Sequence, residues 1–278
     1  MCKVLQVSRS GYYHWLHSKP PRRLLENEEV TRQITIIHKE SKQTYGSPRI
    51  TRELRKREFN ISRPRVARLM KKAGLRSRIK KRFIVTTDSK HRYPIVENRL
   101  KRNFKTDHIG KVWVSDLTYI PTSEGWLYLT IIMDLADRKI IGWSLSESMK
   151  TAKTTLPAWR MALNNRAITK ELIFHSDRGV QYACTEFKEI LETNKSVIRS
   201  MSRKGDCWDN AVAESFFKTL KTELIYRNNF TSRKQAALAI FEYIEIWYNR
   251  KRLHSSLGYK SPEEFGKLLS NNNNQLAA

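Results

Sequence analysis

The chain of 278 residues carries 53 Lys or Arg and 27 Asp or Glu, which gives a formal net charge of +26. This excess goes far beyond what solubility requires, so we expect a polyanionic partner, with nucleic acid ahead of a membrane surface. The three cysteines are far apart and form no CxxC pair, which excludes a disulfide framework and a cysteine zinc site. No uncharged apolar run reaches roughly 18 residues and the first residues lack a signal-peptide core, so we expect a cytoplasmic protein with no membrane partner.

The first 82 residues predict a small all-α domain, preceded by a short helical element over residues 1–25. An amphipathic helix from residue 26 is followed by two short helices with a tight turn between them. Ser47 is expected to cap the first of these helices and Ser62 the second. This pattern indicates a helix-turn-helix domain over residues 26–82.

The helix-turn-helix region is the most basic part of the chain. Residues 47–82 hold 15 Lys or Arg against two Glu. In its second helix the apolar residues recur on one face, and the opposite face predicts contacts to DNA. The cations of that outward face are Arg63, Arg65, Arg68 and Lys72. Entry of this helix into a major groove and a basic hairpin that touches only phosphates both remain open.

A second, larger domain is predicted beyond an extended basic linker over residues 83–106. Three meandering strands come first, and strands then alternate with helices, which predicts an α/β fold with a mixed five-stranded sheet and flanking helices. The expected strands are 112–120, 126–135, 139–146, 171–177 and 197–202. A long helix with inward apolar residues is expected to complete this core of residues 107–265, and the Asn-rich end, 266–278, is expected to be disordered.

Three carboxylates occupy costly positions in this predicted core. Asp116 lies within an apolar strand, Asp177 follows an apolar strand, and Glu214 borders the buried face of a helix. If the first and fourth strands are neighbours and the helix packs across them, the three groups converge, and their mutual repulsion requires a cation. Oxygen ligands without His or Cys favour Mg²⁺ or Mn²⁺, and two such ions would serve an in-line phosphodiester displacement.

The helix that carries Glu214 also carries two lysines on the same edge. Lys218 and Lys221 would hold DNA phosphates against the metals. The simpler interpretation is an (i, i+4) pair of Glu214 with Lys218 on a solvated flank, which this segment alone would favour.

Other polar residues have weaker indications. Asp134 and Asp137 fit a hairpin turn and its shoulder, and His175 fits a structural role better than contact with DNA. Asp209 and Asn210 are candidate caps for the helix of Glu214, and Trp208 either packs beneath that helix or stacks on a base.

Two further basic groups are candidates for DNA contact. Arg178 with Gly179 indicates a tight turn that DNA can approach closely. The cluster of Arg250, Lys251 and Arg252 would form a phosphate-binding edge.

Three blocks, "VWVSDLTYI", "FHSDRGVQY" and "KGDCWDNAVAESFFKTLK", resemble the catalytic blocks of the integrase-type core of insertion-sequence transposases. The chain is most similar to the OrfB product of the IS-three family. The similarity runs from "VSRSGYYHWL" through "YGSPRI" to "YNRKRLHSSLGYKSPEEF", almost the whole chain apart from the tail. One departure is that 36 residues separate Asp177 from Glu214, where the family usually has 35.

The resemblance implies a ribonuclease-H-like fold and an Asp, Asp, Glu metal triad at Asp116, Asp177 and Glu214. It implies a transposase that cuts at the ends of its element and joins the 3′-OH ends to target DNA, with water and then a 3′-OH as nucleophile. It further implies a nucleoid-associated bacterial protein that acts as a homo-multimer on paired ends. An upstream reading-frame product of the OrfA type is a possible partner or fusion.

Two other functions remain as alternatives on the residues. A non-catalytic DNA-binding repressor would use the basic N-terminal domain and leave the three carboxylates unexplained. A metal-dependent nuclease on RNA–DNA hybrids would use the carboxylates without joining DNA ends.

Overall fold

The computed structural model describes residues 2–18, 21–77 and 93–276, with the side chains of residues 207 and 272–276 left aside. The chain divides into two compact units, Met1–Arg78 and Ile79–Ala278. The end of the predicted helix-turn-helix domain and most of the predicted linker, residues 78–92, lie outside the described residues. No helix in the described ranges is long and apolar enough to cross a membrane.

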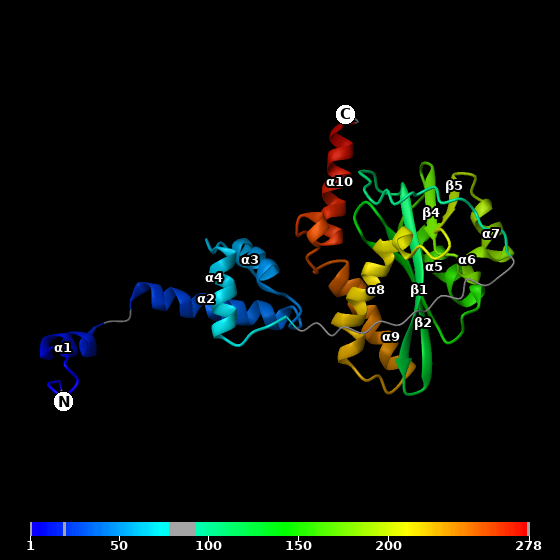
Figure 1. Cartoon of the computed structure of the whole chain (residues 1–278). Helices are drawn as coiled ribbons and strands as arrows, with labels where there is room; N and C mark the ends of the chain where they lie inside the picture. Colours follow the sequence, from blue (N-terminus) through cyan, green and yellow to red (C-terminus); the bar gives the residue numbers. More distant parts are fainter. Residues whose placement is uncertain (1, 19–20, 78–92, 277–278) are drawn as a thin grey trace. The chain divides into compact units, whose positions relative to one another are not determined.

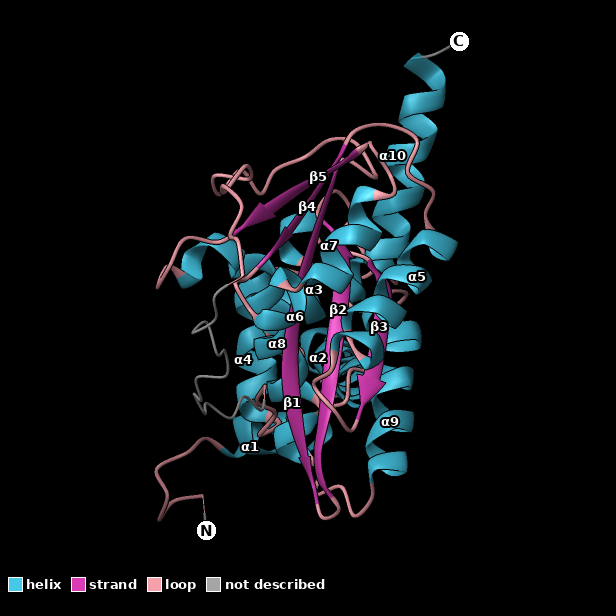
Figure 2. Cartoon of the chain, turned by 90° about the vertical axis from the view of Figure 1, so that its right-hand side faces the viewer, coloured by secondary structure: helices cyan, strands magenta, loops and turns pink. Residues whose placement is uncertain are grey.

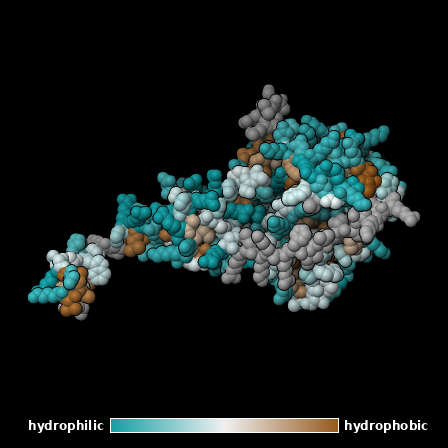
Figure 3. Space-filling view, in the orientation of Figure 1, coloured by the Kyte–Doolittle hydropathy of each residue, from teal (hydrophilic) through white to brown (hydrophobic). Residues whose placement is uncertain are grey.

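The N-terminal unit is all-helical, as predicted. It comprises α1 (Arg9–His17), α2 (Arg22–Glu40), α3 (Ser47–Lys56) and α4 (Arg63–Lys72). Its small core joins the last three helices through Val30, Ile34, Ile50, Leu54, Val66 and Leu69. Helix α1 buries none of its residues, and at this end of the chain the space-filling view shows some brown, apolar residues beside teal and white ones (Figure 3).

The predicted caps of this unit need a correction. Ser47 is the first helical residue of α3 and Gly46 is the cap, because Pro48 fits within the first helical turn, where no backbone N–H is needed. Ser62 does precede α4 at the cap position, but its side chain makes no capping hydrogen bond.

The second unit is built on a five-stranded sheet in the order β3-β2-β1-β4-β5, drawn as magenta arrows in Figure 2. The strands are β1 (Val112–Thr122), β2 (Gly125–Asp134), β3 (Ile140–Ser146), β4 (Leu172–Ser176) and β5 (Val197–Met201). The first three pair antiparallel, whereas β4 and β5 continue parallel to β1. The mixed sheet is confirmed, and the first and fourth strands are neighbours, which is the condition for convergence of the three carboxylates.

Helices cover the sheet as the alternating pattern predicted. They are α5 (Thr155–Asn165), α6 (Val180–Ala183), α7 (Thr185–Glu192), α8 (Ala211–Glu223) and α9 (Arg233–Phe241). A core of Trp113, Trp159, Phe174 and Phe187 joins α5 and α7 to the sheet. Gly142 lets α5 approach closely, because a Cβ there would lie 2.2 Å from the carbonyl oxygen of Ala158. Figure 1 shows α8 running beside β1.

The C-terminal region differs from the single long helix that we expected. Helix α9 continues into a π-helical segment, Glu242–Tyr248, and a new helix, α10 (Pro262–Leu276), begins after a turn. Gly258 adopts a left-handed φ of 63° and Pro262 cannot continue a preceding helix, so the chain must break here.

Disorder was expected for the tail, residues 266–278, whereas the described residues 266–276 are helical in the structure. They belong to α10, because the apolar pattern of Phe265, Leu268 and Leu269 extends the helix toward the Asn run. Asn is a middling helix former and does not by itself end a helix.

Candidate active site

The sheet places Asp116 and Asp177 at the same level of neighbouring strands. Val112, Trp113 and Val114 of β1 pair with Ile173, Phe174 and His175 of β4. Continued by two residues, this parallel register sets Asp116 opposite Asp177, which directly follows β4. The first two predicted catalytic carboxylates are therefore neighbours across the junction of β1 and β4.

Helix α8 is fixed over β1 at both of its ends. At its start the side-chain amide of Asn210 donates a hydrogen bond of 3.1 Å to the carbonyl oxygen of Ser115, the residue before Asp116. Three turns later the ammonium of Lys221 lies over the ring of Tyr119, 5.4 Å from its centroid. Glu214 lies in the first turn of α8, so the helix brings it to the region of the two aspartates.

The three carboxylates lie near enough to influence one another electrostatically. Burial, then the charge of Asp177 and that of Glu214, raise the pKa of Asp116 well above its usual value. Burial and the charge of Asp177 raise the pKa of Glu214. Lys221 reaches the same region, and burial lowers the pKa of its ammonium although the charge of Asp116 opposes this. The three carboxylates and Lys221 therefore share one electrostatic environment.

The turn after β4 is shaped around the Asp177 carboxylate. The backbone N–H of Gly179 donates to Asp177 Oδ1 at 2.9 Å. A Cβ at position 179 would lie 3.0 Å from this oxygen and 3.1 Å from Oε1 of Gln181. Gly179 has an ordinary φ of −59°, so glycine is used here for space beside the carboxylate, and the predicted close turn is present.

A buried hydroxyl pair lies near the two aspartates. Tyr182 Oη and Ser115 Oγ are 2.8 Å apart, and burial, then the charges of Asp177 and Asp116, raise the pKa of Tyr182 well above its usual value. Sequence analysis missed Tyr182 and Gln181. Their position in the same short block as Asp177 was the available signal.

The donor set fits a divalent cation that prefers oxygen ligands. Three carboxylates with no His or Cys among them suit Mg²⁺ or Mn²⁺. Among the residues that the structure describes, no three His, Cys, Asp or Glu side chains already stand together as a ready ligand set. The fit therefore rests on the chemistry of the donors and on their mutual repulsion, which a cation would relieve.

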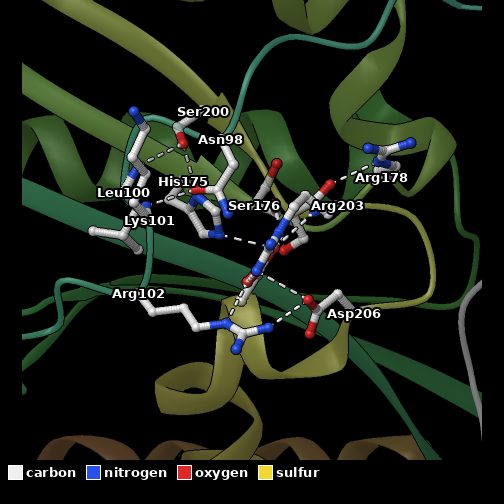
Figure 4. Close-up of polar contacts among 12 residues, drawn as sticks. Asn98, Leu100, Lys101, Arg102, His175, Ser176, Arg178, Ser200, Arg203 and Asp206 are labelled. Carbon is white, nitrogen blue, oxygen red and sulfur yellow. Dashed lines mark hydrogen bonds and ion pairs between the residues drawn. The ribbon is translucent and has the colours of Figure 1, made fainter.

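A second group of acids lies just before α8 and is held by arginines. Asp209 is fully buried and accepts hydrogen bonds from Arg102 Nε at 2.7 Å and from Arg203 Nε at 2.9 Å. Asp206 pairs with the same two guanidinium groups (Figure 4). The hydrogen bonds from Arg203 are the main cause that holds the pKa of Asp209 far below its usual range. We call Arg102, Arg203, Asp206 and Asp209 the arginine clamp.

The remaining buried polar candidates are structural. His175 is fully buried, with Nδ1 2.8 Å from Ser200 Oγ (Figure 4), and burial lowers its pKa to about 4, so it is neutral. Asp134 and Asp137 are buried and both pair with Arg166, at 2.6 and 2.8 Å. These contacts agree with the structural roles that the sequence favoured.

The predicted DNA-contacting residues of this unit fall into two groups. Lys218, Arg250 and Lys251 are exposed and Lys221 is half-buried. Arg178 uses its Nε to donate to the carbonyl oxygen of Ser202 at 2.6 Å, which ties the ends of β4 and β5 together.

The expectation for Arg252 was wrong. Its side chain is only 6% exposed and forms a two-pronged ion pair with Glu223, with a closest distance of 2.8 Å. Helix α8 supplies the acid, so Arg252 joins this helix to the C-terminal segment instead of facing a phosphate.

In the N-terminal unit the predicted outward cations are not equivalent. Arg63, Arg68 and Lys72 are exposed. Arg65 instead donates from Nη2 and Nε to the Asn27 side chain of α2, at 2.9 and 3.1 Å. Arg65 thus stabilises the packing of α4 on α2.

Comparison with known proteins agrees with this architecture. An HTH-like domain family matches residues 25–83, and two integrase core domain families match residues 107–207 and 195–262. The fold and these matches thus define an integrase-type core preceded by an HTH-like domain.

Relatives that are similar in sequence over almost the whole chain give the family. The chain is 42% identical over 265 residues to the insertion element IS600 uncharacterized 31 kDa protein of Shigella sonnei, covering 95% of this chain and 97% of that protein. It is 39% identical over 270 residues to transposase InsF for insertion sequence IS3A of Escherichia coli, covering 95% and 92%. The chain therefore belongs to this family of insertion-element transposases, and it is a transposase of the polynucleotidyl transferase class.

Solved structures show more distant likeness. The simian T-cell lymphotropic virus intasome has a chain with a TM-score of 0.47 at 12% identity, covering 84% of this chain and 73% of that one. The HTLV-2 integrase catalytic core domain in complex with magnesium has a TM-score of 0.39 at 15% identity, covering 56% and 95%.

Proposed function

We propose that Asp116, Asp177 and Glu214 together bind Mg²⁺ or Mn²⁺, as two ions, and that this site performs both steps of transposition. The observation that carries the proposal is that Asp116 and Asp177 lie opposite each other at the junction of β1 and β4. Burial, and then the charge of Asp177, raise the pKa of Asp116. Bound ions would activate the attacking oxygen and stabilise the leaving one in an in-line displacement.

Each protein group then has a defined part. The carboxylates hold charge at fixed positions on β1, on the turn after β4 and on α8. No protein nucleophile is needed, since water opens the phosphodiester at the element end and the resulting 3′-OH attacks the target strand. Lys218 and Lys221 lie one and two turns beyond Glu214 on α8, where they would hold the phosphates of the same DNA strand.

DNA recognition is proposed to involve exposed cations of both units. Arg63, Arg68 and Lys72 on α4 would contact a groove or its phosphates, and Arg250 and Lys251 would form a second phosphate-binding edge. Action on two paired ends requires more than one copy of the chain, and an upstream reading-frame product could add end recognition. Membership in a transposase family favours neither a repressor nor a hybrid-specific nuclease.

Calorimetric titration of Mg²⁺ and Mn²⁺ into the full chain tests the site directly. Asp177→Asn should abolish the binding, because an amide of the same shape lacks the charge that the ions require. Asp107→Asn is the matched control, since the Asp107 side chain is 80% exposed in the same unit. Metal binding of Asp177→Asn that equals the wild type would refute the proposed ligand set.

A further inference from the structure

Trp208 is the most exposed aromatic side chain among the described residues of the catalytic unit. It is 68% exposed, compared with 48% for Trp126. The ring of Trp126 packs against Tyr119, with centroids 4.7 Å apart, whereas no ring contact joins Trp208 to another described residue. Burying an indole on folding is worth about 2 kcal/mol, and this segment forgoes that gain.

The exposure of Trp208 is built into the fold. Trp208 lies in a short 3₁₀ turn, Cys207–Asn210, and the two residues that follow it are buried, with Asp209 at 0% and Asn210 at 3% exposure. Asp209 is held by the arginine clamp, and Asn210 is hydrogen-bonded to Ser115 of β1. The two residues after Trp208 therefore fix its backbone in place, while its indole projects into solvent.

The position of Trp208 relates it to the carboxylates. Glu214 lies six positions further along a continuous 3₁₀ and α-helical path, which corresponds to about 10 Å. Asn210 bonds the residue that precedes Asp116. A nucleotide bound about three positions from the scissile phosphate, at about 3.4 Å each, would come within reach of the indole.

The charge around Trp208 favours a nucleic acid over an apolar partner. Lys204 of the same loop is exposed, and the Arg102 and Arg203 side chains remain 42% and 57% exposed despite their ion pairs. Proteins that bind single-stranded DNA combine exposed aromatic rings, which stack on the bases, with nearby cations, which contact the DNA backbone.

We propose that Trp208 stacks on an unpaired nucleobase close to the scissile phosphodiester and so holds the strand in a locally opened form. The location relative to the chemistry rests on the proposed metal site, but the stacking itself does not require metal. The arginine clamp then has a function beyond stability, because it fixes the stacking platform and the start of α8 together.

The test measures DNA affinity without divalent metal, which separates it from the catalytic proposal. The probes are a paired 30-base-pair duplex and the same duplex with three central mismatches that contain 2-aminopurine. The wild type should bind the mismatched duplex more tightly, and Trp208→Ala should lose about tenfold of that preference, since stacking is worth about 1–3 kcal/mol per base. Trp208→Phe should retain most of it, and the 2-aminopurine signal should change on binding to these two proteins but not to Trp208→Ala.

Trp126→Ala is the matched control, because it removes the other exposed tryptophan of the unit. Equal preference of wild type and Trp208→Ala for the mismatched duplex would overturn the proposal. So would loss of preference in Trp126→Ala alone. If Trp208→Ala kept the preference but failed to self-associate, Trp208 would instead belong to a contact between copies of the chain. Failure of the metal site would appear separately, as metal binding that survives Asp177→Asn.

Discussion

Asp116 and Asp209 are both buried carboxylates of the catalytic unit, yet their surroundings push their pKa values in opposite directions. Asp209 accepts four hydrogen bonds from Arg102 and Arg203, which hold its pKa far below the usual range. Asp116 accepts one backbone N–H from Leu117 at 2.8 Å, and burial beside Asp177 raises its pKa well above the usual value.

On the proposal of a metal site, the difference separates acids that the protein neutralises from acids that it leaves for a cation. The arginine clamp completes the charge balance of Asp209 within the protein, so that this acid needs nothing further. Around Asp116 the negative charge is balanced less completely. The charge of Lys221 lowers the pKa of Asp116, but burial lowers the pKa of the Lys221 ammonium itself. Burying Asp116 beside other carboxylates costs free energy of folding, and a bound cation would remove this cost.

The largest expected effect is on DNA cutting and joining, which should depend on the three site carboxylates and not on the acids that the protein neutralises. Asp116→Asn, Asp177→Asn and Glu214→Gln should each reduce DNA cutting and joining by at least about 1000-fold, because several kcal/mol of charge stabilisation disappear. The variants should fold and bind DNA as the wild type does. A DNA-joining assay with Mg²⁺, combined with circular dichroism, measures both properties.

A matched control for this prediction is Asp134→Asn, an acid that Arg166 neutralises within the fold. Its activity per folded molecule should stay within a few-fold of the wild type. Near wild-type joining by any of the three site variants would remove that residue from the site.

The sheet could be predicted from sequence because its strands carry clear alternation and lie between turn signals. The adjacency of the first and fourth strands was a condition in the sequence argument, and the register of Val112 with Ile173 now meets it. The three acids were detectable because each one interrupts an apolar pattern, which is a local signal.

Long-range pairing could not be predicted in the same way. Nothing in "WYNRKRLH" distinguishes Arg252, which is buried against Glu223, from its exposed neighbours Arg250 and Lys251. Arg102 and Asp209 are 107 residues apart in sequence, so the arginine clamp depends on tertiary packing that no local pattern encodes. Composition favoured a disordered tail, whereas the helical periodicity that precedes the Asn run continues into α10.

The second prediction uses stability to test the arginine clamp. Asp209→Asn should lower the free energy of unfolding by about 3 kcal/mol near pH 7, since the amide cannot replace the buried carboxylate that accepts charge-assisted hydrogen bonds from the part-exposed Arg102 and Arg203 side chains. Urea denaturation of the full chain measures this, with Asp107→Asn as an exposed control that should change it by less than about 0.5 kcal/mol.

The pH dependence of this loss follows from the lowered pKa of Asp209. A carboxylate whose pKa is lower in the folded than in the unfolded state stabilises the fold above its unfolded pKa of about 3.9, and this contribution is lost as the pH falls below that value. The difference between wild type and Asp209→Asn should therefore stay constant from pH 8 to 6 and shrink as the pH falls toward 3.5. A difference that does not depend on pH would mean that Asp209 acts through packing alone.

A smaller effect is expected from the lysines beside the site. Replacing Lys218 and Lys221 together by Gln should raise the DNA concentration for half-maximal joining about tenfold, because two phosphate contacts are lost. Added Mg²⁺ should not restore it. Metal titration measures the metal affinity, and a joining assay over a series of DNA concentrations measures the DNA affinity. Loss of metal affinity with unchanged DNA affinity would contradict the assignment of the two lysines to phosphates.

The smallest effect concerns the N-terminal unit, where the contrast between neutralised and available charges appears again on one helix. Arg63, Arg68 and Lys72 of α4 are exposed, whereas Arg65 is tied to Asn27 of α2. If the exposed cations contact phosphates, each substitution to Gln should flatten the slope of log K against log salt by about 0.9. Arg65→Gln should leave this slope unchanged and lower the stability of the unit instead, since the guanidinium serves the packing of two helices. An equal change of slope for Arg65→Gln and Arg68→Gln would show that the hydrogen bonds to Asn27 give way when DNA binds, and the distinction between held and available charges would then fail for this helix.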